Sequence, residues 1–333
     1  APSVALMKKV SDTKVMPLAI HLNEQVFTPK DGDAWELAKY YSLNGAAVLG
    51  TLLSHPLTHF PYDAINAITK TSLPMDHVIF KLIYPHTYLS LPLSEAVLSS
   101  PGTVLAKNND RIYGPYSAPV GELKDLIAAG YGGMKDNSSY PGYQYPLGPD
   151  KAFGEYGNFL KSYYECIYKF VKTVTDTVPK NDLATVRWAN YIAAWLPGFP
   201  KGVDIFKDDN LAKAVTTFIW DVTVAHSLDH KSFGSLDINK VPMRMRLAPP
   251  SKGLKGFDKN KIVKVIDTMK FEMAMIMFYR PSNVRLFTEI KYDFAQAELQ
   301  KASEEFFKDL KKTDENMKEK YVKLEEIACS IQY

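Results

Sequence analysis

The sequence His55-Pro56-Leu57-Thr58-His59, inside the apolar run Ala47–Phe60, places two imidazoles four residues apart. A second pair with the same spacing, His226-Ser227-Leu228-Asp229-His230, closes another apolar run. On an α-helix, residues i and i+4 lie on one face, one turn apart, so each pair can direct both rings toward one point. Four of the seven histidines of the chain fall into these two pairs.

The two pairs together indicate a metal site. A single pair is weak evidence, because a lone polar or capping histidine is common on helices. Two pairs in mostly apolar runs need an explanation, since a buried imidazole without a partner costs free energy. A metal ion shared by both pairs is the simplest one, and imidazole suits Zn, Cu, Fe or Ni. The pattern leaves two forms open: a closed structural zinc site, or a five- or six-coordinate iron site with a free position.

The composition limits the class of protein. The chain has 333 residues, 46% of them hydrophobic and 12% aromatic, which is ample for a large core. The net charge is only +3 and we find no basic tract, which argues against nucleic acid as a partner. We expect one domain over residues 1–333, because the two His pairs lie on opposite sides of the Pro/Gly loop at 140–149 and must meet.

The compartment is less well defined. Two cysteines, Cys166 and Cys329, are too few for a disulfide framework. The N-terminus has no signal-peptide pattern. Both features favour a cytoplasmic protein, although a secreted protein with a cleaved leader stays an alternative. No run of 18 apolar residues occurs, so we expect no membrane span. Peripheral contact with a membrane remains open.

The periodicity predicts an all-α fold, a single helical bundle that holds one metal between two His-bearing helices. Residues 1–30 are expected to form an irregular arm, and no segment has a convincing pattern of paired strands. Helical spacing begins at Trp35, and Pro56 and Pro61 predict a kink or break beside the first His pair. His21 is expected at the surface, with His77 and His86 structural or supporting the metal ligands. Further helices are expected over 91–105, Glu122–Gly130, Lys151–Val178, Asp182–Trp195, Asn210–His230, Lys259–Tyr279, Leu286–Leu310 and Asp314–Ile327.

Several motifs in order along the chain resemble those of the lipoxygenase family. Trp35-x-Leu37-Ala38-Lys39 is similar to a segment that precedes the first metal-binding His pair in that family. His77 follows His59 by the family's eighteen residues, and Lys81-Leu82-Ile83-Tyr84-Pro85-His86 follows His77. Three more matches are Leu123-Lys124-Asp125-Leu126-Ile127-x-x-Gly130, the helix with His226 and His230, and the terminal Ser330-Ile331-Gln332-Tyr333. The resemblance runs from about residue 27 to residue 333, with long unmatched stretches between the motifs.

This resemblance implies a fold, a metal and a reaction. The fold would be a trimmed lipoxygenase catalytic domain without the N-terminal β-barrel. The cofactor would be non-heme iron, with manganese as an alternative. Lipoxygenases remove a bis-allylic hydrogen from a polyunsaturated fatty acid and add O2 to give a hydroperoxide, so the implied partners are such an apolar substrate and O2. The ligands would be His55, His59, His226, His230 and the carboxylate of Tyr333.

The departures from the family pattern keep other functions open. The first His pair has three intervening residues where the family usually has four, and the last residue is Tyr rather than Ile. Glutamines that usually link the metal site to the substrate pocket are replaced by Thr51 and Phe233. One alternative is therefore an iron enzyme acting on another apolar unsaturated or phenolic molecule. Another is a non-catalytic helical protein with a structural metal.

Overall fold

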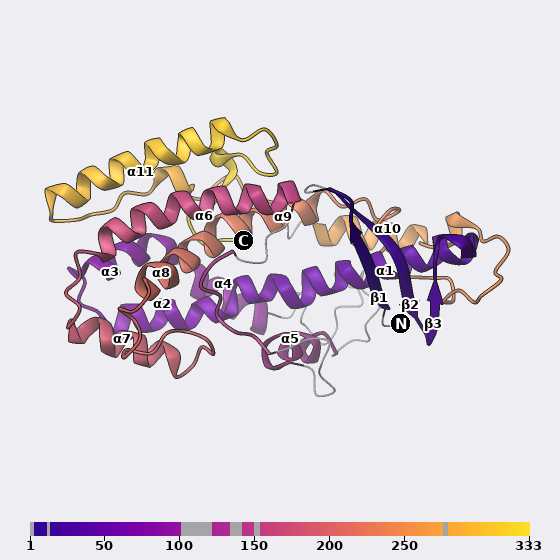
Figure 1. The fold of residues 1–333 in the computed structure, drawn as a ribbon, viewed down its shortest axis with the longest axis horizontal. Coiled ribbons are helices and arrows are strands. Elements are labelled where there is room, and N and C mark those ends of the chain that lie inside the picture. The colour runs from indigo at the N-terminus through magenta and orange to yellow at the C-terminus, as the bar shows by residue number, and fades with distance from the viewer. Residues whose placement is uncertain (1–2, 12–13, 101–121, 134–141, 150–153, 276–278) are drawn as a thin grey trace. The chain divides into compact units, whose positions relative to one another are not determined.

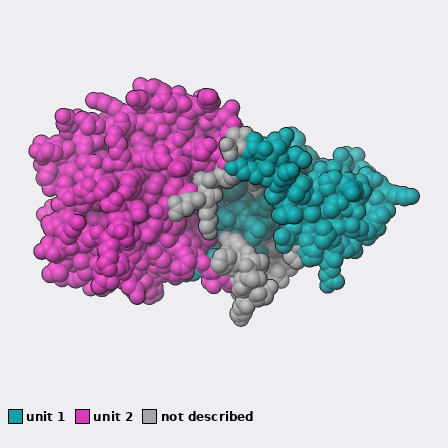
Figure 2. Space-filling view, in the orientation of Figure 1, with its two compact units in different colours: residues 1–56, 97–131, 232–279 teal, residues 57–96, 132–231, 280–333 magenta. Residues whose placement is uncertain are grey.

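The computed structural model describes residues 3–11, 14–100, 122–133, 142–149, 154–275 and 279–333. These residues are predominantly helical, as the sequence predicts, with one small antiparallel sheet (Figure 1). The chain forms two compact units, each assembled from three chain segments. Unit 1 comprises residues 1–56, 97–131 and 232–279, and unit 2 comprises residues 57–96, 132–231 and 280–333 (Figure 2). Whether they act as a single domain stays a prediction.

Unit 1 begins with the sheet, so the predicted irregular arm over residues 1–30 is wrong. The strands β1 (Ser3–Lys9), β2 (Val15–Leu22) and β3 (Gln25–Phe27) pair in that order, with a register shift between Leu6 and Met7. One face of the sheet is buried at Ile20, Leu22 and Phe27. It packs on α1 (Asp33–Leu49), which presents its own buried side chains Trp35, Leu37, Ala38 and Tyr41.

The remainder of unit 1 is held by side-chain bonds to its third segment. The Tyr41 hydroxyl donates to the Leu247 carbonyl oxygen over 2.5 Å, and the Asn44 amide donates to the Pro242 carbonyl oxygen over 2.8 Å. Arg246 forms a two-bond ion pair with the buried Asp267 carboxylate on α10 (Val265–Met275). Most of α5 (Glu122–Gly132) also belongs to this unit.

Unit 2 is a helical assembly with one large core. It contains α2 (Phe60–Ser72), α3 (Val78–Ile83), most of α4 (Ser90–Ser99), α6 (Gly154–Thr175), α7 (Leu183–Ala193), α8 (Asn210–Trp220), the start of α9 (His226–Gly234) and α11 (Ala297–Asn316). The long helix α6 packs against α8 on one side and α11 on the other. Its helical repeat of Phe159, Tyr163, Ile167 and Val171 is buried, as the periodicity predicts.

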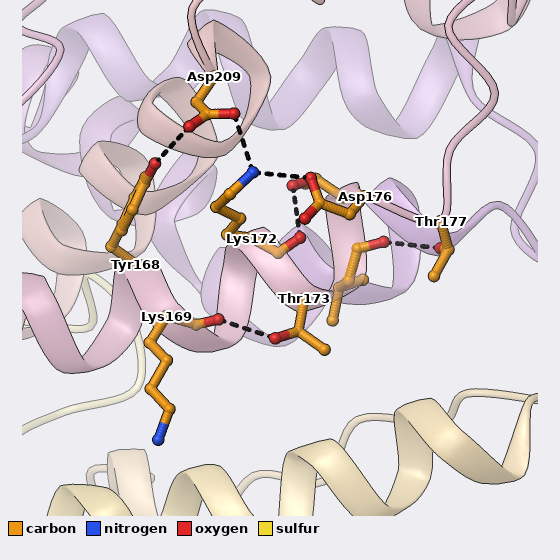
Figure 3. Close-up of polar contacts among 9 residues, drawn as sticks. Tyr168, Lys169, Lys172, Thr173, Asp176, Thr177 and Asp209 are labelled. Atoms are coloured by element: carbon orange, nitrogen blue, oxygen red, sulfur yellow. Dashed lines mark hydrogen bonds and ion pairs between the residues drawn. The ribbon is translucent and has the colours of Figure 1, made fainter.

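Ion pairs at the surface tie α6 to the start of α8. Lys172 donates to Asp176 one turn later and to Asp209, each over 2.9 Å, and the Tyr168 hydroxyl donates to the other Asp209 oxygen (Figure 3). Asp209 has a left-handed backbone with φ of +59° and immediately precedes α8. Exposed pairs of this kind contribute little to stability, so the buried apolar faces hold these helices together.

The end of unit 2 differs from the prediction. The helices expected over Leu286–Leu310 and Asp314–Ile327 are replaced by a single helix, α11, with irregular chain before and after it that includes 3-10 turns at Phe287–Glu289 and Leu324–Glu326. Residues 327–331 are buried in the core, with at most 1% of each exposed. In the part of the chain that the structure describes, no helix is both long enough and apolar enough to cross a membrane.

Candidate metal centre

The first His pair lies at a break between two helices, as Pro56 and Pro61 predict. α1 ends at Leu49 and continues as a π-helical turn over Gly50–Ser54, followed by a 3-10 turn over His55–Thr58. His59 then occupies the N-cap position of α2, with Pro61 in the first turn. Pro is well accepted there, because the first N–H groups of a helix have no partner within it. The break allows His55 and His59 to adopt separate backbone conformations.

The second His pair follows a matching π-helical turn. α8 ends at Trp220 and continues through Asp221–Ala225 into α9, which His226 opens. In each π turn the histidine that follows donates its backbone N–H to the first residue of the turn, His55 to Gly50 and His226 to Asp221.

Each π turn also contains a threonine bonded to the preceding helix. The Thr51 hydroxyl donates to the Ala47 carbonyl oxygen over 2.8 Å, and the Thr223 hydroxyl donates to the Ile219 carbonyl oxygen over 2.6 Å. Such bonds to the carbonyl four residues earlier often bend helices. The two helices that precede the His pairs are therefore altered by the same device.

Three of the histidines lie together in unit 2. The ring centroid of His226 lies 4.7 Å from that of His59 and 4.5 Å from that of His230, and the centroids of His59 and His230 are 6.5 Å apart. All three are buried, with exposed fractions of 8% for His59, 0% for His226 and 4% for His230. Three imidazoles converging in a buried region are a candidate ligand set.

His55 completes a group of four. One ring nitrogen from each of His55, His59, His226 and His230 lies within 4.8 Å of the other three. Nitrogen ligands bind such metals at about 2.1 Å, so two ligands on opposite sides of one ion are about 4 Å apart. The spread of the four nitrogens therefore fits a shell around a single ion. Four neutral imidazoles suit iron, zinc or copper rather than calcium or magnesium.

The C-terminal segment is bonded into unit 2 next to this group. The Ala328 N–H donates to the Ser227 hydroxyl over 3.1 Å, and Ser227 lies between the two histidines of α9. The Ser330 hydroxyl donates to the Tyr88 carbonyl oxygen over 2.7 Å. These bonds fix the path of the chain toward its last residue.

Tyr333 lies against the second His pair. Its ring centroid is 4.5 Å from that of His230 and 5.4 Å from that of His226. Burial raises the pKa of its phenol, although Ser227 acts in the opposite direction. The contacts described are those of the ring, so the role of the main-chain carboxylate as a fifth ligand stays a prediction.

The other three histidines have separate places. His21 is exposed on β2, and His77 caps the N-terminus of α3 while its Nε2 lies 3.2 Å from an Asp182 carboxylate oxygen. His86 is fully buried, with Nδ1 2.8 Å from the Cys329 carbonyl oxygen and Nε2 2.8 Å from the Tyr292 hydroxyl. His86 therefore holds the C-terminal segment in place.

The two residues at the family's glutamine positions do not reproduce an amide. Thr51 is buried and directs its hydroxyl to its own helix. Phe233 packs edge-on against the His55 ring, with centroids 5.6 Å apart. A buried pair missed in the sequence analysis is Tyr62 and Asp221, whose side chains are hydrogen-bonded across 159 positions of sequence.

Comparison with known proteins relates the chain to lipoxygenases. It is 27% identical over 290 residues to polyunsaturated fatty acid lipoxygenase ALOX15 of Pongo abelii, and equally to the protein of that name of Homo sapiens. Each alignment covers 75% of this chain and 41% of the relative. The chain thus spans less than half the length of these curated relatives. No model of a protein family matches the chain.

Solved structures share the fold. Coral 8R-lipoxygenase has a TM-score of 0.75 at 15% identity, and the match covers 99% of this chain and 55% of the coral protein. A LOX variant (delta413-417:GS) in complex with arachidonate has a TM-score of 0.76 at 17% identity, with 99% and 54% covered. The chain is a lipoxygenase-like domain with the fold of lipoxygenase catalytic domains, as the sequence motifs predict.

Proposed function

We propose that this lipoxygenase-like chain is a non-heme iron dioxygenase that acts on a polyunsaturated fatty acid. The observation that supports this most directly is the group of four buried histidines, with one ring nitrogen of each within 4.8 Å of the others, in the fold of lipoxygenase catalytic domains. At the level of the family, the curated relatives are lipoxygenases and hence oxidoreductases. The substrate and the iron belong to the proposal.

The ligands of the proposed iron are His55, His59, His226, His230 and the carboxylate of Tyr333. Bound iron would supply the one-electron chemistry that a helical protein of ordinary side chains lacks. The fatty acid would lose a bis-allylic hydrogen atom, as an electron and a proton, and O2 would add to the resulting carbon radical. Return of one electron and one proton to the peroxyl radical would complete the hydroperoxide, so the product contains all the atoms of the fatty acid and O2.

The chain's own residues contribute position and the exclusion of water. The π turn before His226 is buried at Val222, Thr223 and Val224, and Leu228 between the two histidines of α9 is also buried. An apolar shell of this kind protects a radical from competing reactions and tunes the metal through its low polarity. His86 and Ser227 position the C-terminal segment and, with it, Tyr333.

A second candidate keeps the iron and changes the substrate to another apolar unsaturated or phenolic compound. Thr51 and Phe233 favour it, because neither offers the amide that links metal and substrate pocket in the family. The Phe233 ring instead packs against His55. A substrate panel separates the two candidates.

The first experiment is metal analysis of the purified protein combined with oxygen uptake. We expect about one iron per chain and O2 consumption with linoleate or arachidonate. Iron with O2 consumption only on other unsaturated or phenolic substrates would favour the second candidate. A result of one manganese per chain would change the metal of the proposal from iron to manganese, since both metals suit such a site. Stoichiometric zinc without O2 uptake would contradict both enzyme proposals and leave a structural metal.

Changes at Tyr333 test the fifth ligand. We expect deletion of Tyr333, or addition of residues after it, to weaken iron binding at least ~10-fold and to impair activity, because either change removes or displaces a carboxylate ligand. Tyr333→Phe is the matched control, since it keeps the main-chain carboxylate and a ring of similar size. Iron content and oxygen uptake are the measurements. Unchanged values in both altered proteins would rule out the carboxylate ligand.

A further inference from the structure

Tyr62 and Asp221 join the two His-bearing segments of unit 2. Tyr62 lies in the first turn of α2, three residues after His59, and Asp221 opens the π turn that immediately precedes His226. The Tyr62 hydroxyl donates a hydrogen bond to the Asp221 carboxylate. A direct side-chain bond thus connects the segment that carries His59 with the segment that carries His226.

The backbone connects each member of this pair to a histidine. The Tyr62 N–H donates to the His59 carbonyl oxygen over 3.1 Å. The His226 N–H donates to the Asp221 carbonyl oxygen across the π turn. Three hydrogen bonds, joined through the residues Tyr62 and Asp221 themselves, therefore link His59 to His226. The ring centroids of the two histidines are 4.7 Å apart.

The surroundings keep Tyr62 in one orientation. Only 2% of Tyr62 is exposed. Its ring packs edge-on against the rings of Phe218 and Tyr145, with centroid distances of 5.8 Å and 6.0 Å. The Tyr145 hydroxyl is itself bonded to the Ala214 carbonyl oxygen. Burial raises the pKa of Asp221 to about 7, and the bond from Tyr62 acts against that rise. In such a desolvated place a hydrogen bond is stronger than in water, and losing it is costly.

We propose that Tyr62 and Asp221 are positioning residues that set the separation of His59 and His226 for one metal ion. The pair acts through the backbone of the two histidines and does not touch the metal itself. This inference rests on the metal site of the proposed function. Partners that orient metal ligands commonly change metal affinity 10–100-fold when they are removed.

The test replaces Tyr62 with Phe, which removes one oxygen atom and keeps the ring. Fe(II) affinity is measured anaerobically by competition with a chelator, and Co(II) spectra report the geometry of the site. We expect Tyr62→Phe to weaken Fe(II) binding about 10-fold or more and to alter the Co(II) spectrum. Thermal unfolding of each metal-free protein measures the purely structural effect.

The chain offers a matched control in Tyr163→Phe. Tyr163 is also fully buried, and its hydroxyl donates to a carboxylate, Asp314 Oδ1, over 2.9 Å. This pair connects α6 with the end of α11 and involves none of the four histidines. We expect Tyr163→Phe to lower the unfolding temperature comparably while leaving the Fe(II) affinity and the Co(II) spectrum unchanged.

Two variants at Asp221 complete the test. Asp221→Ala should weaken Fe(II) binding as Tyr62→Phe does, and adding it to Tyr62→Phe should cause little further loss. Asp221→Asn keeps an oxygen that accepts the Tyr62 bond and should restore most of the affinity. Wild-type affinity in both Tyr62→Phe and Asp221→Ala would overturn this inference while the proposed function stands. A wild-type protein that binds neither Fe(II) nor Co(II) would instead overturn the proposed metal site.

Discussion

His226→Ala is expected to reduce the iron content of the purified protein from about one per chain to almost none. His226 is fully buried and lies centrally in the group, with the rings of His59, His230 and Tyr333 within 5.4 Å. Its removal leaves at most three imidazoles and opens a cavity beside them. A large-to-small change in a packed core typically costs 2–5 kcal/mol, so metal content has to be measured on the folded fraction of the protein.

His77→Ala serves as the control for this experiment. His77 belongs to the same unit but contacts Asp182 and the start of α3 rather than the histidine group. The variant His77→Ala should retain the full iron content and the oxygen uptake of the wild-type protein. Full iron retention in His226→Ala would refute the assignment of ligands, whatever the activity of the variant.

The second large effect concerns stability in acid. Burial lowers the pKa of His86 to about 4, and its bond to the Cys329 carbonyl only partly opposes this. Because the unfolded chain takes up this proton near its ordinary pKa of 6.5, the folded state loses stability as the pH falls from about 6.5 to about 4. The full contribution is about 3 kcal/mol for this one residue. Above about pH 7 it no longer depends on pH.

The measurement compares the free energy of unfolding of the wild-type protein and His86→Gln across this pH range. Glutamine can still donate to the Cys329 carbonyl and accept from Tyr292, but it does not titrate. We expect the pH slope between about 6.5 and 4 to be shallower in His86→Gln. Burial also raises the pKa of Asp63 to about 6 and that of Asp221 to about 7, but both groups titrate in both proteins and cancel in the difference. An equal slope in His86→Gln and in the wild-type protein would contradict the prediction.

The candidate site was predictable because its signals are local. The spacing of four residues within each His pair is fixed by helix geometry, and the two proline positions indicated the break before α2. Apolar periodicity likewise placed α6, since a buried helical face repeats along the sequence itself. One ring nitrogen of each of the four histidines lies within 4.8 Å of the others. That they bind a metal stays a prediction.

The sheet could not be predicted for a physical reason. Alternation of buried and exposed residues is the signal of a strand, and here it is confined to the end of β2 near Ile20 and Leu22. Pro17 lies within β2, and a proline weakens the strand signal of the sequence around it. The strand β1 is largely exposed, and its pairing with β2 has a register shift. The hairpin therefore lacks a repeated pattern in either strand.

Two other features were missed because they depend on long-range bonds: the non-helical chain after α11 and the Tyr62–Asp221 pair. Charged and apolar residues after Asp314 have the composition of an amphipathic helix, yet the chain beyond α11 is irregular with a 3-10 turn at Leu324–Glu326. Its last part, Ala328 and Cys329, bonds to distant residues, namely Ser227, His86 and Arg285. The Tyr62–Asp221 bond joins positions 159 residues apart. Contacts of this kind leave no spacing in a single sequence.

The buried segment 327–331 also constrains when the protein can finish folding. These residues leave the ribosome after all the described helices and strands, because they follow them in the sequence. The helices that they pack against have been synthesised much earlier. The core of unit 2 therefore stays incomplete until the segment 327–331 has been synthesised and has left the ribosome. During that interval the nascent chain is most vulnerable to aggregation and proteolysis, and the Ala328–Ser227 bond is among the last to form.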